Sequence, residues 1–258
     1  MLITAAVVPG PPAFVPELMG SAAHELDDLR AAADRAVSRA VSDLVAAPSG
    51  PPSSGSGARQ LVVVGAGTPG EFDAAGPVSF AGFGREVVVP ALVAGQQGNR
   101  DLPTPIMVAR YLANRDIAAH PEHAQLWASA RWVTTSGEDA TALGERLGAD
   151  SQPVALILVA DGAACHGPKA PRAQDERAQA YDDEVWSALA SGQPARLAKI
   201  DEALGDELSA TGAQVWPVLA GAAESASGVG EVPDWTGEVL WVGAPYGVGW
   251  AVASWRRS

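Results

Sequence analysis

Short runs of apolar, largely β-branched residues recur along this chain and alternate with stretches whose apolar residues follow helical spacing. The clearest run is VALILVA, within Pro153–Ala160, which leads directly into Asp161-Gly162. Strands of continuous apolar residues are typical of sheets covered by helices on both faces. The pattern therefore predicts an α/β fold with a central, mostly parallel or mixed sheet and helices on both faces.

The same periodicities predict where the individual elements lie. The expected strands are Leu2–Val8, Leu61–Val64, an edge strand at Glu86–Val89, Arg131–Thr135, Pro153–Ala160, and a closing pair formed by Val239–Val242 and Gly249–Trp255. The expected helices are Ser21–Val45, Ile106–Asn114, Ala140–Leu147, Asp175–Ala190, Leu197–Leu208 and Gln214–Ala223. The Gly-rich stretch from Gly65 to Gly84 is expected to be a long loop. Pro48–Ala58, PSGPPSSGSGA, is expected to be a flexible loop within one domain spanning residues 1–258.

Charge and cysteine content narrow the classes of partner and compartment. Thirty acidic residues against 17 basic ones give a formal net charge of -13, which repels nucleic-acid phosphates and anionic lipids. Cys165 is the single cysteine, so no intramolecular disulfide can form. The apolar N-terminus lacks a basic leader and stops at Pro9, and no run of about 18 apolar residues occurs. We therefore expect a cytoplasmic protein that associates with neither nucleic acid nor membrane, which leaves a small molecule as a possible ligand.

Three turns are the places to look for chemistry. Ligands of open α/β sheets bind outside the carboxyl ends of the strands. Those ends are here followed by Pro9-Gly10-Pro11-Pro12, by Gly65-Ala66-Gly67-Thr68 and by Asp161-Gly162.

Three segments, taken in order, resemble one known family. They are AAVVPGPPAFVPEL at the start, LILVADGAACHGPKAPRAQDERAQAYD in the middle and APYGVGWAVASW near the end. They resemble the class III extradiol dioxygenase catalytic-subunit (LigB-like) superfamily, which is related to the Memo proteins. The resemblance implies a LigB-like fold, an Fe(II) ion held by two histidines and a carboxylate, a further histidine acting as acid or base, and self-association as a homodimer.

This chain departs from the family pattern at the positions that would bind iron. Gly10 stands where the resemblance places the first histidine, and Gly65-Ala66-Gly67-Thr68 holds no histidine for the second. The late carboxylate, or the cysteine of Memo proteins, would fall near Thr211-Gly212. Neither Thr211 nor Gly212 suits iron, so we expect no metal and no cofactor.

His166 falls where the family's acid/base histidine would lie. His166 and Asp161, which lies at the strand end, are the candidate catalytic residues. Lys169 lies close to them in sequence. Gly10, Gly67, Thr68 and Lys169 are the candidate binding residues. The competing interpretation is a loop histidine on a solvated turn, which is the commoner outcome for a motif without structural context. Cys165, beside His166, is more typical of a small buried filler than of a nucleophile.

Two further motifs invite a functional interpretation and have a plainer one. His120 and His123, in HPEH, are three residues apart with Glu122 between them, but Pro121 favours the solvated first turn of a helix. Gly65, Gly67 and Gly70 match a dinucleotide-binding G-x-G-x-x-G, but Pro69 and the absence of a helical pattern after Gly70 count against it.

The sequence thus predicts a LigB-like homologue with a degenerate iron site, without ring-cleavage activity, that binds a small molecule or a protein. The alternative is an enzyme of altered, metal-independent chemistry that uses the pocket around Asp161 and His166. A nucleotide-binding domain is a third, weaker interpretation.

Overall fold

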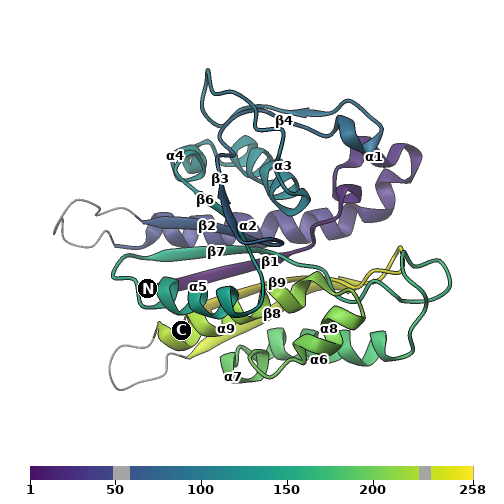
Figure 1. Cartoon of the computed structure of the whole chain (residues 1–258). Coiled ribbons are helices and arrows are strands. Elements are labelled where there is room, and N and C mark those ends of the chain that lie inside the picture. Colours follow the sequence, from purple (N-terminus) through teal and green to yellow (C-terminus); the bar gives the residue numbers. More distant parts are fainter. Residues whose placement is uncertain (49–58, 227–233, 258) are drawn as a thin grey trace.

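The computed structural model describes residues 1–48, 59–226 and 234–257, together forming a layered α/β structure (Figure 1). The fold class predicted from the sequence is confirmed. The loop predicted at Pro48–Ala58 lies, apart from Pro48, outside the described residues. In the described part of the chain, no helix is both long enough and apolar enough to cross a membrane.

A seven-stranded mixed sheet forms the centre of the molecule, in the order β3-β6-β2-β7-β1-β9-β8. Its strands are β1 (Leu2–Val8), β2 (Gln60–Ala66), β3 (Gly70–Phe72), β6 (Arg131–Thr135), β7 (Val154–Val159), β8 (Trp235–Gly243) and β9 (Trp250–Arg257). The four inner strands β6, β2, β7 and β1 are parallel, whereas β3 pairs antiparallel with β6, β9 with β1, and β8 with β9. A separate two-stranded sheet pairs β4 (Val78–Ser79) with β5 (Val88–Val89).

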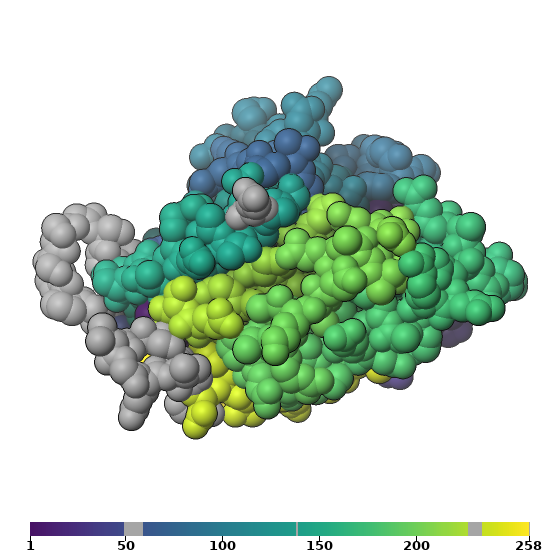
Figure 2. Space-filling model, turned by 60° about the horizontal axis from the view of Figure 1, so that its bottom comes forward, coloured from purple at the N-terminus to yellow at the C-terminus, as the bar shows by residue number. Residues whose placement is uncertain are grey.

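Helices cover both faces of the main sheet, with α2 and α3 on one side and α5, α6 and α9 on the other (Figure 1). The α-helices are α1 (Pro16–Met19), α2 (Asp27–Ala46), α3 (Thr104–Ala119), α4 (Ala124–Ala128), α5 (Glu138–Gly148), α6 (Arg177–Ser191), α7 (Pro194–Leu197), α8 (Glu202–Glu207) and α9 (Trp216–Ser225). The 3-10 turns are η1 (Pro12–Phe14), η2 (Gly20–Leu26), η3 (Ala81–Phe83), η4 (Pro121–His123) and η5 (Thr211–Gln214). In Figure 2 the face that carries α5 to α9 comes forward.

The apolar runs of the sequence are explained by this two-sided cover. Along β7, Leu156 and Leu158 pack into the core beneath α5, α6 and α9, whereas Ala155 and Ile157 pack into the core beneath α2 and α3. Successive side chains of a strand point to opposite faces, so a strand buried on both faces is apolar at every position.

Four segments differ from their prediction. The edge strand predicted at Glu86–Val89 is limited to β5, Val88–Val89, which pairs with β4 in the separate sheet. The segment predicted as one helix over Leu197–Leu208 forms two helices, because the Asp201 side chain accepts a hydrogen bond from the Leu204 N–H (3.0 Å) and so caps α8 at its start. The helix predicted from Ser21 begins as the 3-10 turn η2, and α2 itself starts at Asp27. The Gly-rich segment contains β3 and β4 rather than loop alone.

Candidate functional site at the carboxyl edge of the sheet

The three turns singled out in the sequence lie at one edge of the sheet, called here the carboxyl edge. Strands β2, β7 and β1 are adjacent and parallel, so their carboxyl ends lie together. Strand β9 runs antiparallel to β1, which brings the β8–β9 turn to the same edge. A hydrogen bond from the Gly162 N–H to the Gly249 carbonyl (2.7 Å) joins that turn to the end of β7.

Asp161 connects the turns at this edge. Its carboxylate Oδ1 accepts the Gly10 N–H (3.0 Å), its own N–H donates to Thr211 Oγ1 (3.1 Å), and its carbonyl accepts the Gly212 N–H (2.7 Å). Burial raises the pKa of the Asp161 carboxyl to about 6, and the hydrogen bond from Gly10 only partly opposes this shift. Among the described residues, no basic side chain forms an ion pair with it, so Asp161 is a carboxyl group that burial pushes toward its neutral form.

His166 pairs with a buried carboxylate that the sequence analysis did not single out. Its Nε2 lies 2.6 Å from Oδ2 of Asp182, on α6, and the two side chains are 13% and 2% exposed. Oδ1 of Asp182 accepts the Ala163 N–H (2.9 Å), and the His166 N–H donates to the Gly247 carbonyl (3.0 Å). Both members of the pair are therefore held by the backbone of the carboxyl edge.

A signal for Asp182 was present in the sequence. The helix that contains it was predicted from the spacing of Ala178, Tyr181, Val185 and Leu189, and Asp182 lies on the same side, four residues after Ala178. A carboxylate on the buried face of a helix is rare unless it has a partner. The polar turn after β7 supplies that partner, His166.

Two glycines make room for the Asp182 carboxylate. A Cβ atom at Gly249 would lie 1.7 Å from Oδ2 of Asp182, and one at Gly162 would lie 2.4 Å from its Oδ1. Any side chain at either position would displace Asp182 from His166. The backbone at these two strand ends is thus shaped around the pair.

The His166–Asp182 pair borders a small cavity of about 110 Å³, which is also lined by Gln179, Asp183 and Trp186. Burial raises the pKa of Asp182, while the Ala163 N–H and the His166 ring oppose that rise. We assign the proton of the neutral ring to Nε2, which faces the carboxylate, and the lone pair therefore to Nδ1. Among the described residues Nδ1 has no hydrogen-bond partner, so it can accept a proton or a hydrogen bond from a ligand.

The remaining predicted binding residues do not line this cavity. Thr68 is exposed and its carbonyl accepts the hydroxyl of Thr134 (2.6 Å), while the Gly67 N–H donates to Thr135 (3.2 Å). Lys169 is exposed and forms no ion pair within the described residues. No hydrogen bond joins Asp161 to His166, so the two predicted catalytic residues share the edge but His166 takes Asp182 as its partner.

The residues at the expected iron position do not fit an iron centre. A Cβ at Gly10 would lie 2.9 Å from Cγ1 of Val159, and one at Gly65 would lie 2.7 Å from Cβ of Pro105, in the first turn of α3. The backbone of Thr211-Gly212 is already bonded to Asp161. Side chains of the strand-end valine and of Pro105 thus fill the space that ligands at Gly10 and Gly65 would need.

The structure also shows where Cys165 and the glycine motif that ends at Gly70 lie. Cys165 is buried, with its Sγ directed to the Leu208 carbonyl (3.7 Å), and burial raises the pKa of its thiol, as suits a buried filler. Gly70 begins β3 rather than a helix. The helix N-terminus that a dinucleotide pyrophosphate needs is therefore absent after this glycine.

The interpretation of HPEH as a solvated helix start is wrong for His123. Its side chain is only 2% exposed, because η4 folds it against α2 and α3, where Asp116 and Ser42 contact its two ring nitrogens. His120 and Glu122 remain substantially exposed, at 40% and 62%. A buried histidine with a buried carboxylate partner was not foreseen.

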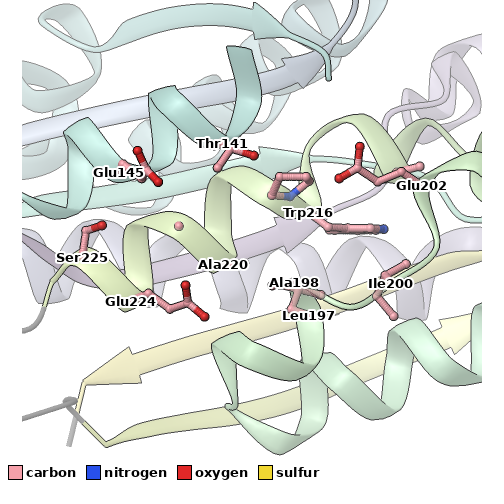
Figure 3. A pocket seen from close by; sticks show the side chains of 13 residues that line it. Thr141, Glu145, Leu197, Ala198, Ile200, Glu202, Trp216, Ala220, Glu224 and Ser225 are labelled. Carbon is pink, nitrogen blue, oxygen red and sulfur yellow. The ribbon is translucent and has the colours of Figure 1, made fainter. Parts of the chain in front are cut away.

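A second cavity lies between α5, α7 and α9 (Figure 3). Glu145 and Glu224 lie toward one end of it and Glu202 and Trp216 toward the other (Figure 3). None of the residues predicted to form a site lines it.

Comparison with known proteins does not assign the chain. No family model matches it, and no curated protein matches it.

Proposed function

We propose that this chain is a LigB-like homologue without an iron centre, which binds a small polar molecule at the His166–Asp182 pair. The resemblance of its three segments supports the family, and the packing of Val159 and Pro105 against the glycines at the expected ligand positions supports the loss of iron. The observation that carries the binding site is the 2.6 Å contact between His166 and a buried Asp182 beside a cavity.

The cavity suits a ligand that donates hydrogen bonds. His166 Nδ1 and the carboxylate of Asp183 are acceptors, and the half-buried Trp186 offers an apolar surface. A small aromatic diol such as catechol combines both properties. Catechol is therefore the probe for this site, with binding expected and ring cleavage not expected.

Binding can be measured by calorimetric titration of catechol into the wild-type protein and into His166→Ala. Wild type is expected to bind, and His166→Ala to bind up to about 10-fold more weakly, since one lost hydrogen bond is worth about 0.5–1.5 kcal/mol. Lys169→Ala is the matched control, because Lys169 lies outside the cavity. Equal affinities of wild type and His166→Ala would place any catechol site elsewhere.

A second candidate function is metal-independent acid/base catalysis at the same pair. A buried carboxylate that fixes the tautomer of a histidine is the arrangement found in many general-base sites. The short His166–Asp182 contact favours it. In a strain with a measurable phenotype on deletion, catalysis predicts that Asp182→Asn and His166→Ala reproduce the deletion, whereas binding alone predicts a milder effect of Asp182→Asn.

A further inference from the structure

The His120–Glu122–His123 cluster lies at the opposite end of α3 from the site described above. Pro105, in the first turn of α3, packs at the carboxyl edge, and the helix, which is 16 residues and roughly 24 Å long, ends just before His120. Ligand atoms of His120, Glu122 and His123 all lie within 4.8 Å of one another. The two imidazole rings are stacked, with their centroids 4.9 Å apart.

The buried carboxylate of Asp116 organises this cluster from behind. Its Oδ2 accepts hydrogen bonds from Nδ1 of His123 (2.8 Å) and Nε1 of Trp127 (2.7 Å), and its Oδ1 accepts one from the hydroxyl of Ser38 (2.5 Å). Asp116 is 4% exposed, so three donors fix it in place. Metal-binding histidines characteristically donate their second ring N–H to such a carboxylate, which orients the ring and makes the other nitrogen more basic.

The bond to Asp116 places the proton of neutral His123 on Nδ1 and leaves the lone pair on Nε2. The partner of Nε2 is the hydroxyl of Ser42 at 3.3 Å, a long hydrogen bond to an exposed side chain. This contact is the weakest of those around His123. A cation could replace it without leaving any buried group unpaired.

The order Ser42, His123, Asp116 is also that of a nucleophile, its base and an orienting acid. Ser42 lies inside α2, however, where backbone N–H groups are used within the helix. They cannot stabilise an oxyanion, so the arrangement lacks an essential part of an acyl-transfer site. The cavity that reaches Ser38 and Asp116 does not include Ser42.

We propose that His120, Glu122 and His123 bind a divalent transition-metal ion of the Zn²⁺ class, with Asp116 as the carboxylate that orients His123. Two imidazoles and one carboxylate are a ligand set that suits zinc and leaves a fourth position for water. Tetrahedral zinc requires its ligand atoms to be roughly 3.5 Å apart, and here they lie within 4.8 Å of one another, so the exposed side chains of His120 and Glu122 have to turn toward His123 for the site to close.

The test is a titration of the untagged full-length chain, stripped of metal, with Zn²⁺ against a chromophoric chelator, and with Co²⁺ followed by its visible absorption. Wild type is expected to take up one equivalent of each ion. His120→Ala and Glu122→Gln alter exposed side chains and are each expected to weaken binding by at least about 100-fold, more than the 10–100-fold typical for an outer-shell partner. His24→Ala, at another exposed histidine, is the control and is expected to bind like wild type.

Ser42→Ala separates metal binding from the role of Ser42 as a hydrogen-bond partner. It removes the only group that competes for Nε2 of His123 among the described residues, so its Zn²⁺ affinity is expected to equal or exceed that of wild type. The proposal is overturned if wild type takes up no stoichiometric ion. It is equally overturned if uptake survives unchanged in His120→Ala or in Glu122→Gln.

Discussion

Asp161 and Asp182 are two carboxyl groups at the same edge of the sheet, and their surroundings give them different roles. Asp182 has a histidine partner and two glycines, Gly162 and Gly249, that make room for its carboxylate. Asp161 accepts one hydrogen bond from Gly10 and has a pKa raised to about 6. Asp161 therefore holds the turns together, while Asp182 positions His166.

The raised pKa of Asp161 predicts how stability depends on pH. Because the folded-state pKa exceeds the ordinary value of 3.8, the favourable neutral form is fully present below about pH 4 and is lost as the pH rises through about 6. Asp161→Asn stays neutral and can still accept the Gly10 N–H. Relative to wild type, urea unfolding should therefore show the variant gaining up to about 3 kcal/mol between pH 4 and pH 7.5. A difference that does not change with pH contradicts the assignment.

The tautomer of His166 depends on Asp182. Asp182→Asn removes the negative charge that holds the ring proton on Nε2, so ¹⁵N chemical shifts of the ring should change from those of one tautomer to those of a mixture. Asp183→Asn, at the exposed neighbour, should leave the shifts unchanged. If both variants give wild-type shifts, Asp182 does not fix the ring.

At the scale of elements, α3 approaches the strand ends closely, and its Pro105 lies against Gly65 of β2. Gly65→Ala would bring a Cβ to 2.7 Å from the rigid ring of Pro105, and it should cost about 1–3 kcal/mol of unfolding free energy. Gly82→Ala, where no atom lies within 4 Å of the new Cβ, should change stability by about 0.5 kcal/mol or less. Equal stabilities in thermal or urea unfolding would mean that the space at Gly65 is open.

Arg110, on α3, holds the segment that carries β4 and β5. Its buried guanidinium donates to the carbonyls of Ala74, Gly76 and Pro90, and burial lowers its pKa to about 10. Arg110→Met leaves three carbonyls without this donor and should cost at least about 3 kcal/mol in urea unfolding. Arg115→Met, which breaks an ion pair between two partly exposed side chains, should cost about 1 kcal/mol or less. Similar losses in both variants would contradict this role of Arg110.

At the scale of the whole molecule, the sequence predicts those elements whose own residues form a recognisable apolar or β-branched pattern. Buried strands such as Leu2–Val8 and Arg131–Thr135 were predicted with their observed ends, because each is a continuous apolar or β-branched run. The strand β3 was missed, because its three residues owe their conformation to pairing with β6. Long-range pairing of this kind leaves no periodicity in a short segment.

The sequence could predict where the candidate site lies, but not which side chains pair with one another there. The three strand ends meet as expected, since that follows from parallel order alone. The pairing of His166 with Asp182 depends on how α6 returns over the edge, and the burial of His123 depends on how η4 folds against α2. Both are set by tertiary packing.

The most direct test of the account is to load the protein anaerobically with Fe(II) and to assay catechol cleavage in air by the absorbance of the ring-opened product. The background should be His120→Ala/Glu122→Gln, so that iron bound at the proposed metal site does not contribute. The account predicts no stoichiometric iron and no cleavage in that background, because Gly10 and Gly65 supply no ligand atoms and Val159 and Pro105 leave no room for a side chain at those positions. One equivalent of iron with iron-dependent ring cleavage would contradict it.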